Sequence, residues 1–185
     1  MLKIHYTNPP TQSSLYLQTM ATQYILRTGL PSDMTTIVQR HAAIYSADYN
    51  FNPDLAVREA QKVATDFIAT QDPALERCWI AEVNNEFAGC VILVRDKAET
   101  NFKCAKLRLL LVEPSARGLG IGKDLIQQCT NFAREAGYAR IRLWTNSGLI
   151  TARKLYAREG YNLIKSEEDS TFGIPLTAEF WELAL

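Results

Sequence analysis

The sequence lacks a long uninterrupted apolar run and any excess of one charge. No stretch of 18 consecutive apolar residues occurs in it, so we expect no membrane-spanning helix. Lysine plus arginine and aspartate plus glutamate number 20 each, so no overall basic field favours nucleic acid as a partner. The N-terminus also lacks a signal-peptide pattern, because polar residues interrupt any apolar segment there. We therefore expect a cytoplasmic protein without a membrane or nucleic-acid partner.

Cysteine and histidine are scarce, with four and two residues respectively. The cysteines are scattered without the spacing of metal ligands, and only His5 and His41 could complete a zinc site. We therefore expect no metal site. We interpret all the cysteines as reduced core residues of a cytosolic protein. They are Cys78, Cys90, Cys104 and Cys129.

The length of 185 residues and an apolar content of 47% predict one domain with a substantial core. We place this domain at residues 23–185. Residues 1–22 contain the loop-forming segment 8–14 and form either an appendage, which packs on the domain or on a second subunit, or a loosely ordered leader.

The order of hydrophobic patterns predicts strands and helices in alternation. Strands 78–83, 87–95 and 106–112 should form an antiparallel meander, and strand 140–144 should lie parallel to the third because a helix joins them. The complete set is strand 23–27, a helix from Ser32 or Asp33, a helix from Asp54 to near Gln71, these three strands, helix 120–136, strand 140–144, helix 149–158 and strands 161–166 and 179–185.

The most informative stretch runs from residue 107 to residue 135. It begins with an apolar run, breaks at residues 113–115, continues as the glycine-rich segment 117–122 and ends in an amphipathic helical pattern. A strand, a glycine loop and a helix in this order aim free backbone N–H groups at a phosphate. The helix dipole adds partial positive charge at the same end, and Arg117 adds a full charge. The stretch therefore predicts an anion site.

Two common phosphate motifs do not fit this loop. A P-loop requires Gly-x-x-x-x-Gly-Lys-Ser/Thr, but Arg117 stands at the first glycine position and Asp124 at the hydroxyl position. A dinucleotide fingerprint requires Gly-x-Gly-x-x-Gly, and here the third glycine comes one residue early. The pattern that remains is Arg-x-x-Gly-x-Gly, formed by Arg117, Gly120 and Gly122. It resembles the acetyl-coenzyme A (acetyl-CoA) loop of the GNAT superfamily of N-acetyltransferases.

A second segment resembles the other signature of that superfamily. Residues 152–161 read Ala-x-x-x-Tyr followed by a Gly-aromatic step, with Tyr156 on the predicted helix. Residues 78–82 and 106–114 further resemble acetyltransferase domains that are fused to winged-helix regulators. Because this chain has no room for such a regulator, we expect a stand-alone relative. The expected fold is α/β (α+β in some schemes), with a central mixed, mostly antiparallel twisted sheet of about seven strands and about four flanking helices.

The resemblance implies an enzyme that transfers acetyl directly from acetyl-CoA to a primary amine and releases coenzyme A. Tyr156 matches the family's general acid, which protonates the leaving thiolate; the alternative is an ordinary packed aromatic residue. A backbone N–H near Leu111 could stabilise the thioester oxygen. The expected cofactor contacts are Leu111, Val112, Arg117, Gly118, Leu119, Gly120, Ile121, Gly122, Lys123, Asn146 and Ala152.

Two departures from the family pattern leave details open. The family often has asparagine six residues before the tyrosine, where this chain has Ile150; Asn146, Ser147 or water could substitute. The family's frequent glutamate base is replaced by Arg108. Glu113 is our substitute for the base, Glu82 and His41 are others, and a water chain or an amine that arrives neutral would need none of them.

The acceptor site is predicted from two further observations. His41, Tyr45 and Tyr49 recur every fourth residue and fall along one helical face, as an acceptor wall or as a half-buried aromatic stripe. Arg108 could bind a carboxylate of the acceptor through its planar fork, or it could pair with Glu82 on a neighbouring strand. The first choice favours an amino acid or another small amphoteric amine.

Other functions remain open at this point. A protein or peptide N-acetyltransferase would require an open acidic groove, and the only dense acidic run is residues 167–169. A non-catalytic acyl-CoA-binding module would not require Tyr156. A homodimer is possible through the last strands or the leader, although nothing in the sequence demands it.

Overall fold

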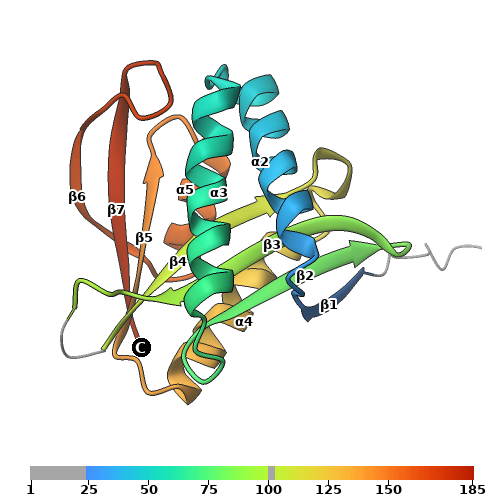
Figure 1. The fold of residues 1–185 in the computed structure, drawn as a ribbon. Coiled ribbons are helices and arrows are strands. Elements are labelled where there is room, and N and C mark those ends of the chain that lie inside the picture. Colours follow the sequence, from blue (N-terminus) through green and yellow to red (C-terminus); the bar gives the residue numbers. More distant parts are fainter. Residues whose placement is uncertain (1–23, 100–102) are drawn as a thin grey trace, which may run out of the picture.

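The computed structural model describes residues 24–99 and 103–185, and its centre is a twisted seven-stranded sheet (Figure 1). The strands are β1 (Tyr24–Thr28), β2 (Arg77–Val83), β3 (Glu86–Arg95), β4 (Cys104–Val112), β5 (Arg140–Asn146), β6 (Asn162–Asp169) and β7 (Leu176–Ala184). The predicted appendage, residues 1–22, lies outside the described residues.

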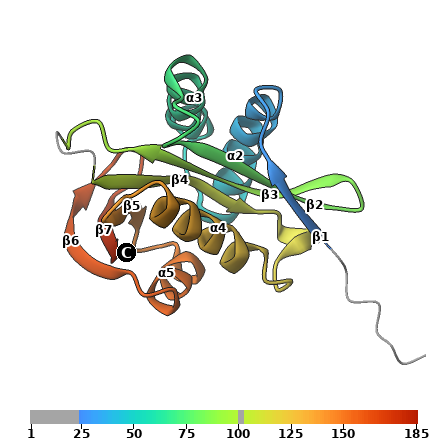
Figure 2. The ribbon, with the colours of Figure 1, turned by 90° about the horizontal axis from the view of Figure 1, so that it is seen from below.

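Over residues 24–99 and 103–185, four α-helices and one short 3-10 helix accompany the sheet. They are α2 (Asp33–Tyr49), α3 (Pro53–Thr70), η1 (Pro114–Ala116), α4 (Ile121–Glu135) and α5 (Ile150–Arg158). Helices α2 and α3 cover one face of the sheet, and α4 and α5 lie on the other (Figure 2). Within the described part of the chain, none of the helices is long and apolar enough to cross a lipid bilayer.

The strand order is β1-β2-β3-β4-β5-β7-β6. All neighbouring strands pair antiparallel except β4 and β5, which pair in parallel. The predicted meander, the parallel pair and the mixed α/β architecture are therefore confirmed. The parallel pair follows from α4, which crosses over between β4 and β5 and returns the chain to the same end of the sheet.

The central strand β3 shows why the sheet needs helices on both faces. Its residues from Ala88 to Leu93 are all buried. Val91 and Leu93 join the core that contains residues of α4, whereas Cys90 and Ile92 join the core that contains residues of α2 and α3. Alternate side chains of a strand point to opposite faces, so an uninterrupted apolar run is buried on both sides.

The strand ends differ from the sequence prediction on one side of the sheet. Strand β5 continues to Asn146 and β7 begins at Leu176, because Thr145 and Asn146 pair with Glu179 and Ala178 of β7. Strand β6 also continues to Asp169, which pairs with Leu176. These segments are too polar for a strand pattern, so their extended conformation depends on ladder hydrogen bonds with a distant neighbour.

Candidate active site

The parallel strands β4 and β5 separate halfway along their length. Their pairing covers only Cys104–Leu107 of β4 and ends at Leu107 opposite Leu143. Beyond this point β4 stays on β3, whereas β5 stays on β7. The separation leaves one backbone edge of β4, from residue 108 to residue 112, without a partner on β5.

A bulge in β4 accompanies the separation. Cys90 pairs with Leu111 and Ile92 pairs with Arg108, so Leu109 and Leu110 together oppose a single residue of β3. Leu109 has a φ of 51°, which is uncommon for a residue with a side chain. A bulge of this kind bends the strand and redirects neighbouring side chains, which moves β4 away from β5.

A cavity of about 1070 Å³ opens at this separation. We call its two parts the loop end, lined by residues of the glycine loop and α5, and the sheet end, lined by Arg108, Trp144, Phe172, Phe180 and Lys165. The predicted site residues that line the cavity are His41, Tyr45, Tyr49, Arg108, Leu111, Val112, Arg117, Gly118, Gly120, Ile121, Gly122, Lys123, Asn146, Ala152 and Tyr156.

The glycine loop presents unpaired backbone donors at the loop end. Among the described residues, the N–H groups from Gly118 to Lys123 have no hydrogen-bond acceptor, and the first donor of the next turn is Asp124 N–H, 3.1 Å from the Gly120 carbonyl oxygen. Gly118 and Gly120 have φ values of 86° and 91°, which glycine adopts without steric cost. This geometry fits a phosphate or pyrophosphate group.

Two charged side chains around the loop, Arg117 and Asp124, already have partners. The Arg117 guanidinium lies 2.7 Å from a carboxylate oxygen of Asp48 on α2. Asp124, in the first turn of α4, accepts a 2.5 Å hydrogen bond from the Tyr24 hydroxyl on β1. This hydrogen bond raises the pKa of Tyr24 to about 12. The donors that the loop leaves free for an anion are therefore mainly backbone N–H groups, since Arg117 is already paired with Asp48.

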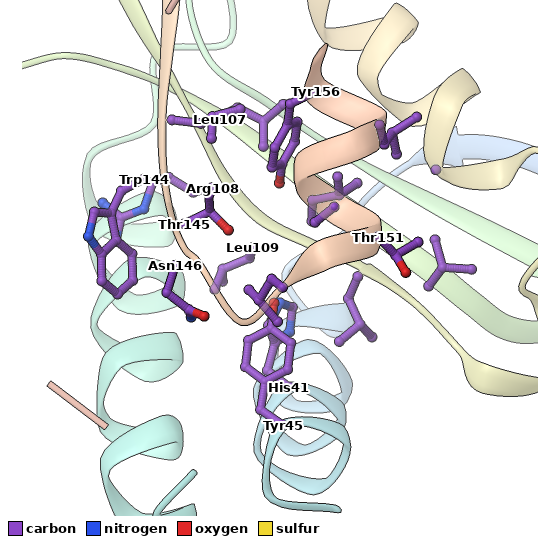
Figure 3. A pocket seen from close by; sticks show the side chains of 18 of the residues that line it. His41, Tyr45, Leu107, Arg108, Leu109, Trp144, Thr145, Asn146, Thr151 and Tyr156 are labelled. Carbon is purple, nitrogen blue, oxygen red and sulfur yellow. The ribbon is translucent and has the colours of Figure 1, made fainter. Parts of the chain in front are cut away.

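Tyr156 is held by α5 between the core and the cavity. Its side chain is buried, its ring contacts Tyr161 with 5.8 Å between centroids, and Figure 3 shows its hydroxyl pointing into the cavity. Burial raises its pKa well above the usual value near 10. The hydroxyl therefore keeps its proton at neutral pH and is available as a donor to a group in the cavity.

Helix α2 forms another wall. The helix extends to Tyr49, so the predicted row of His41, Tyr45 and Tyr49 lies on one face, with edge-to-face ring contacts of 5.5 and 5.9 Å. His41 is buried, its Nδ1 lies 2.9 Å from the Ile37 carbonyl oxygen and its Nε2 has no partner among the described residues. Burial lowers the pKa of His41 to about 4, so the imidazole is neutral. The row both packs in the core and lines the cavity.

The predicted carboxylate bases have other partners. Glu113 accepts two hydrogen bonds of 2.6 Å from the Arg40 guanidinium on α2, and it is not one of the residues that line the cavity. Glu82 is 2.7 Å from Arg27 on the neighbouring strand β1. Both carboxylates are thus explained by ion pairs that join elements of the fold.

Arg108, in contrast to these two carboxylates, forms no ion pair within residues 24–99 and 103–185. The alternative pairing with Glu82 is absent, since Glu82 binds Arg27. The guanidinium is half-buried on the wall of the cavity. Burial lowers the pKa of Arg108, while Glu59 and Asp66 act in the opposite direction; an arginine nevertheless stays charged. A fixed, unpaired cation in a largely apolar cavity attracts an anionic ligand group.

Three predicted positions serve the cavity in other ways. The Asn146 side chain is buried at the end of β5, and its Oδ1 accepts a 3.0 Å hydrogen bond from the Gly148 N–H. This bond fixes the turn that leads into α5. Ala152 lines the cavity from α5, whereas Leu119 packs against the core and does not line it. Of these three side chains, only that of Leu119 faces the core and not the cavity, so Leu119 could contact a ligand only through its backbone.

The sequence analysis missed the aromatic residues that close the sheet end. Phe172 in the β6–β7 loop stacks on Phe51 with 4.5 Å between ring centroids, and it contacts Trp144 at 5.7 Å. The Phe172 carbonyl oxygen accepts a 3.0 Å hydrogen bond from Asn52 N–H. The strand alternation offered one signal: Trp144 lies on the face of β5 opposite the core residues Ile141 and Leu143.

Comparison with known proteins gives one family. The model of the "Acetyltransferase (GNAT) family" matches residues 39–161. A human protein, N-acetyltransferase 8B, is 33% identical over 84 residues, which make up 45% of this chain and 37% of the relative. The chain thus matches little more than a third of the length of that relative.

Solved structures share the fold. Ribosomal-protein-alanine N-acetyltransferase from Brucella melitensis has a TM-score of 0.70 with 16% identity, covering 87% of this chain and 99% of that chain. The structure of yncA from Salmonella typhimurium with its cofactor acetyl-CoA has a TM-score of 0.66 with 16% identity, covering 88% and 94%. At this level of identity the similarity establishes the fold and leaves the substrate open.

Proposed function

The chain belongs to the acetyltransferase (GNAT) family, and on that premise we propose that it transfers the acetyl group of acetyl-CoA to the amine of a small amphoteric molecule such as an amino acid. The observation that carries the proposal is the buried Tyr156 hydroxyl, which points into the cavity between the glycine loop and the unpaired guanidinium of Arg108. The general acid Tyr156, the anion site of the glycine loop and the Arg108 cation that would bind the acceptor thus line the same cavity.

The loop end fits acetyl-CoA. The unpaired N–H groups of residues 118–123 match the oxygens of a pyrophosphate, and the free edge of β4 matches the amide groups of the pantetheine arm. Acetyl-CoA supplies an activated acetyl thioester. Helix α5 then places Tyr156 at the inner part of the cavity, where the sulfur would lie.

The reaction requires one bond to form and one to break. The amine nitrogen forms a C–N bond to the acetyl carbon, the C–S bond breaks, the Tyr156 hydroxyl gives a proton to the sulfur and the nitrogen loses a proton. Tyr156 is suited to the acid role because burial keeps its hydroxyl protonated until charge develops on the sulfur. Both exchanged protons return through solvent, which balances the reaction.

We assign no carboxylate base. Glu113 and Glu82 are held by Arg40 and Arg27, so neither is free to accept a proton. An amine that enters this largely apolar cavity beside Arg108 loses solvation for its charged form, which lowers its pKa. The acceptor therefore reacts as the neutral amine.

A small acceptor is favoured over a protein. One side of the sheet end is covered by the stacked pair Phe51 and Phe172 and by the hydrogen bond from Asn52 to the β6–β7 loop. An extended peptide that crossed this side would have to displace these contacts, whereas a molecule of amino-acid size would not. A non-catalytic acyl-CoA-binding module has no need of a hydroxyl aimed into the cavity.

The test is thiol release from acetyl-CoA across amino acids, amines, aminoglycosides and peptides, with Tyr156→Phe beside the wild type. We expect at least one amphoteric amine to be acetylated, and kcat to fall about 10²–10⁴-fold in the variant with acetyl-CoA affinity unchanged. Tyr138→Phe is the matched control, since the Tyr138 hydroxyl bonds the Leu75 carbonyl oxygen elsewhere in the fold. Tight acetyl-CoA binding with no acetylated small molecule would overturn the proposal.

A further inference from the structure

A row of cavity-lining side chains crosses four adjacent strands at the sheet end. Arg108 and Trp144 come directly after the last paired residues of β4 and β5, Trp144 pairs with Phe180 of β7, and Phe180 pairs with Lys165 of β6. All four residues line the cavity. The row thus begins with a cation at the point where the strands separate and continues over two aromatic rings.

The cations of this region differ in their partners. Lys106 is 2.8 Å from Asp96, and Lys165 forms an ion pair with Glu167. Arg108 alone among these three has no carboxylate partner in the described part of the chain. At the sheet end, an anionic ligand group would therefore settle at Arg108, where no internal ion pair has to be broken. The other cavity-lining cations without an ion pair in the described residues belong to α4 and α5 at the loop end; they are Lys123, Lys154 and Arg158.

The aromatic part of the row is open toward the cavity. Trp144 is 37% exposed, although it is a large apolar side chain, and it contacts the buried Phe172 at 5.7 Å. Phe180 is partly exposed next to it, and the Lys165 ammonium lies over its ring, 5.2 Å from the centroid. A ring that is supported from one side and open on the other is arranged to cover an apolar ligand group. Figure 3 shows Trp144 and Arg108 on one wall, with Tyr156 on α5 across the cavity.

From this row we infer that the acceptor is an α-amino acid with an aromatic side chain. The inference rests on the proposed function and specifies its substrate class. In an α-amino acid the amine and the carboxylate are attached to one carbon, so a carboxylate on Arg108 keeps the amine at the separation of β4 and β5, near Tyr156. The side chain then extends along the row over Trp144 and Phe180.

The same geometry disfavours other amines. A polyamine or an aminoglycoside would bring positive charge to Arg108 with no carboxylate to compensate it. Alanine or glycine would reach Arg108 but leave the rings of Trp144 and Phe180 in water. An aromatic amine without a carboxylate would cover the rings and leave Arg108 unpaired, so it binds less well than the amino acid.

The experiment compares kcat/KM for L-phenylalanine, L-alanine and phenethylamine at saturating acetyl-CoA. For the wild type we expect L-phenylalanine to exceed L-alanine by about 10–100-fold, from burial of one aromatic side chain. Trp144→Ala should lower kcat/KM for L-phenylalanine about 10-fold, through KM, and leave that for L-alanine unchanged. Trp144→Phe should retain most of the preference, which separates loss of the ring from loss of folding.

Arg108→Met completes the design, because it removes the charge and keeps most of the volume. It should weaken both amino acids about equally and should not weaken phenethylamine, which has no carboxylate to lose its partner. Equal kcat/KM values for L-phenylalanine and L-alanine, or a preference that survives Trp144→Ala, would overturn the inference while acetyl transfer itself stands. A wild type that acetylates no amine at all would instead overturn the proposed function, and with it this inference.

Discussion

The loop end and the sheet end of the cavity are built in different ways. At the loop end, the backbone of residues 118–123 supplies the donors, and the surrounding groups come from one continuous part of the chain between β4 and α5. At the sheet end, the ligand-facing groups are side chains of β4, β5, β6, β7 and the β6–β7 loop. Backbone donors tolerate changes in neighbouring side chains, whereas a wall of side chains from many elements changes with each of them. The difference explains how one fold can keep the same acetyl donor and vary the amine that accepts the acetyl group.

The largest expected effect is the pH dependence of the free energy of unfolding that arises from His41 of α2. The folded protein holds His41 neutral, with a pKa of about 4 because of burial, whereas the unfolded chain binds a proton below about 6.5. The contribution to stability is complete above pH 6.5 and is lost as the pH falls from 6.5 to 4, by up to about 3 kcal/mol.

Urea unfolding from pH 7 to pH 4, with His41→Gln beside the wild type, measures this contribution. The variant cannot titrate at this position, so the stability advantage of the wild type should shrink as the pH falls. A difference that stays constant over this range would show that the imidazole is not buried in its neutral form.

The second prediction concerns the ion pair between Arg40 of α2 and Glu113, which follows β4. Glu113→Gln leaves Arg40 with a neutral partner, and we expect a loss of about 2 kcal/mol, below the range for fully buried pairs because Arg40 is partly exposed. The kcat should stay within about twofold, since Glu113 does not line the cavity. Arg40→Gln should cost a similar amount, and the double variant less than the sum.

Denaturant midpoints and steady-state kinetics separate this from a catalytic role. If Glu113→Gln kept its full stability and lost 10²-fold or more in kcat, Glu113 would be the base predicted from the sequence.

The third prediction tests the backbone character of the loop end. Gly120→Ala places a side chain at a φ of 91°, which costs about 1–2 kcal/mol and turns the N–H groups away from the anion. We expect the Kd for acetyl-CoA, measured by calorimetry, to rise about 10-fold. Gly137→Ala is the matched control. Gly137 follows the C-terminal end of α4, has a φ of 78° and has no heavy atom within 4 Å of the position that a Cβ would take. Equal Kd values for the two variants would refute the role of the loop backbone.

The smallest effect is expected at the ion pair between Asp48 and Arg117. Asp48→Asn releases Arg117 for the anion, so the Kd for acetyl-CoA should fall about two- to fivefold, in line with the strength of an exposed pair. The gain should shrink in high salt because the charges are screened. An increase in Kd would mean that Asp48 orients Arg117 for the ligand.

Much of the scaffold was predictable because it depends on local patterns. The apolar run of β3 and the helical period of α4 each lie within one segment, and the structure confirms the strand and the helix predicted there. The parallel pairing of β4 and β5 followed from the crossover helix alone. The ends of β5, β6 and β7 were wrong by two or three residues, since there the ladder decides and not the local pattern.

The site was predictable only where one segment carries it. Choosing between two roles for Arg108 required knowing that Arg27 binds Glu82, across 55 residues. The position of Glu113 required knowing that Arg40 binds it from α2, across 73 residues. No local signal carries such pairings, because several acidic residues were equally available in the sequence.

By itself, the sequence determined the glycine loop, the order of the elements and the helix that carries Tyr156, since backbone conformation and hydrophobic period are set by residues close together in the chain. The tertiary structure alone decided that Arg108 stays unpaired and that Trp144, Phe172 and Phe180 gather beside it. That arrangement depends on the separation of β4 from β5 and on the register of β5, β7 and β6, which are properties of the packed sheet and of no single strand.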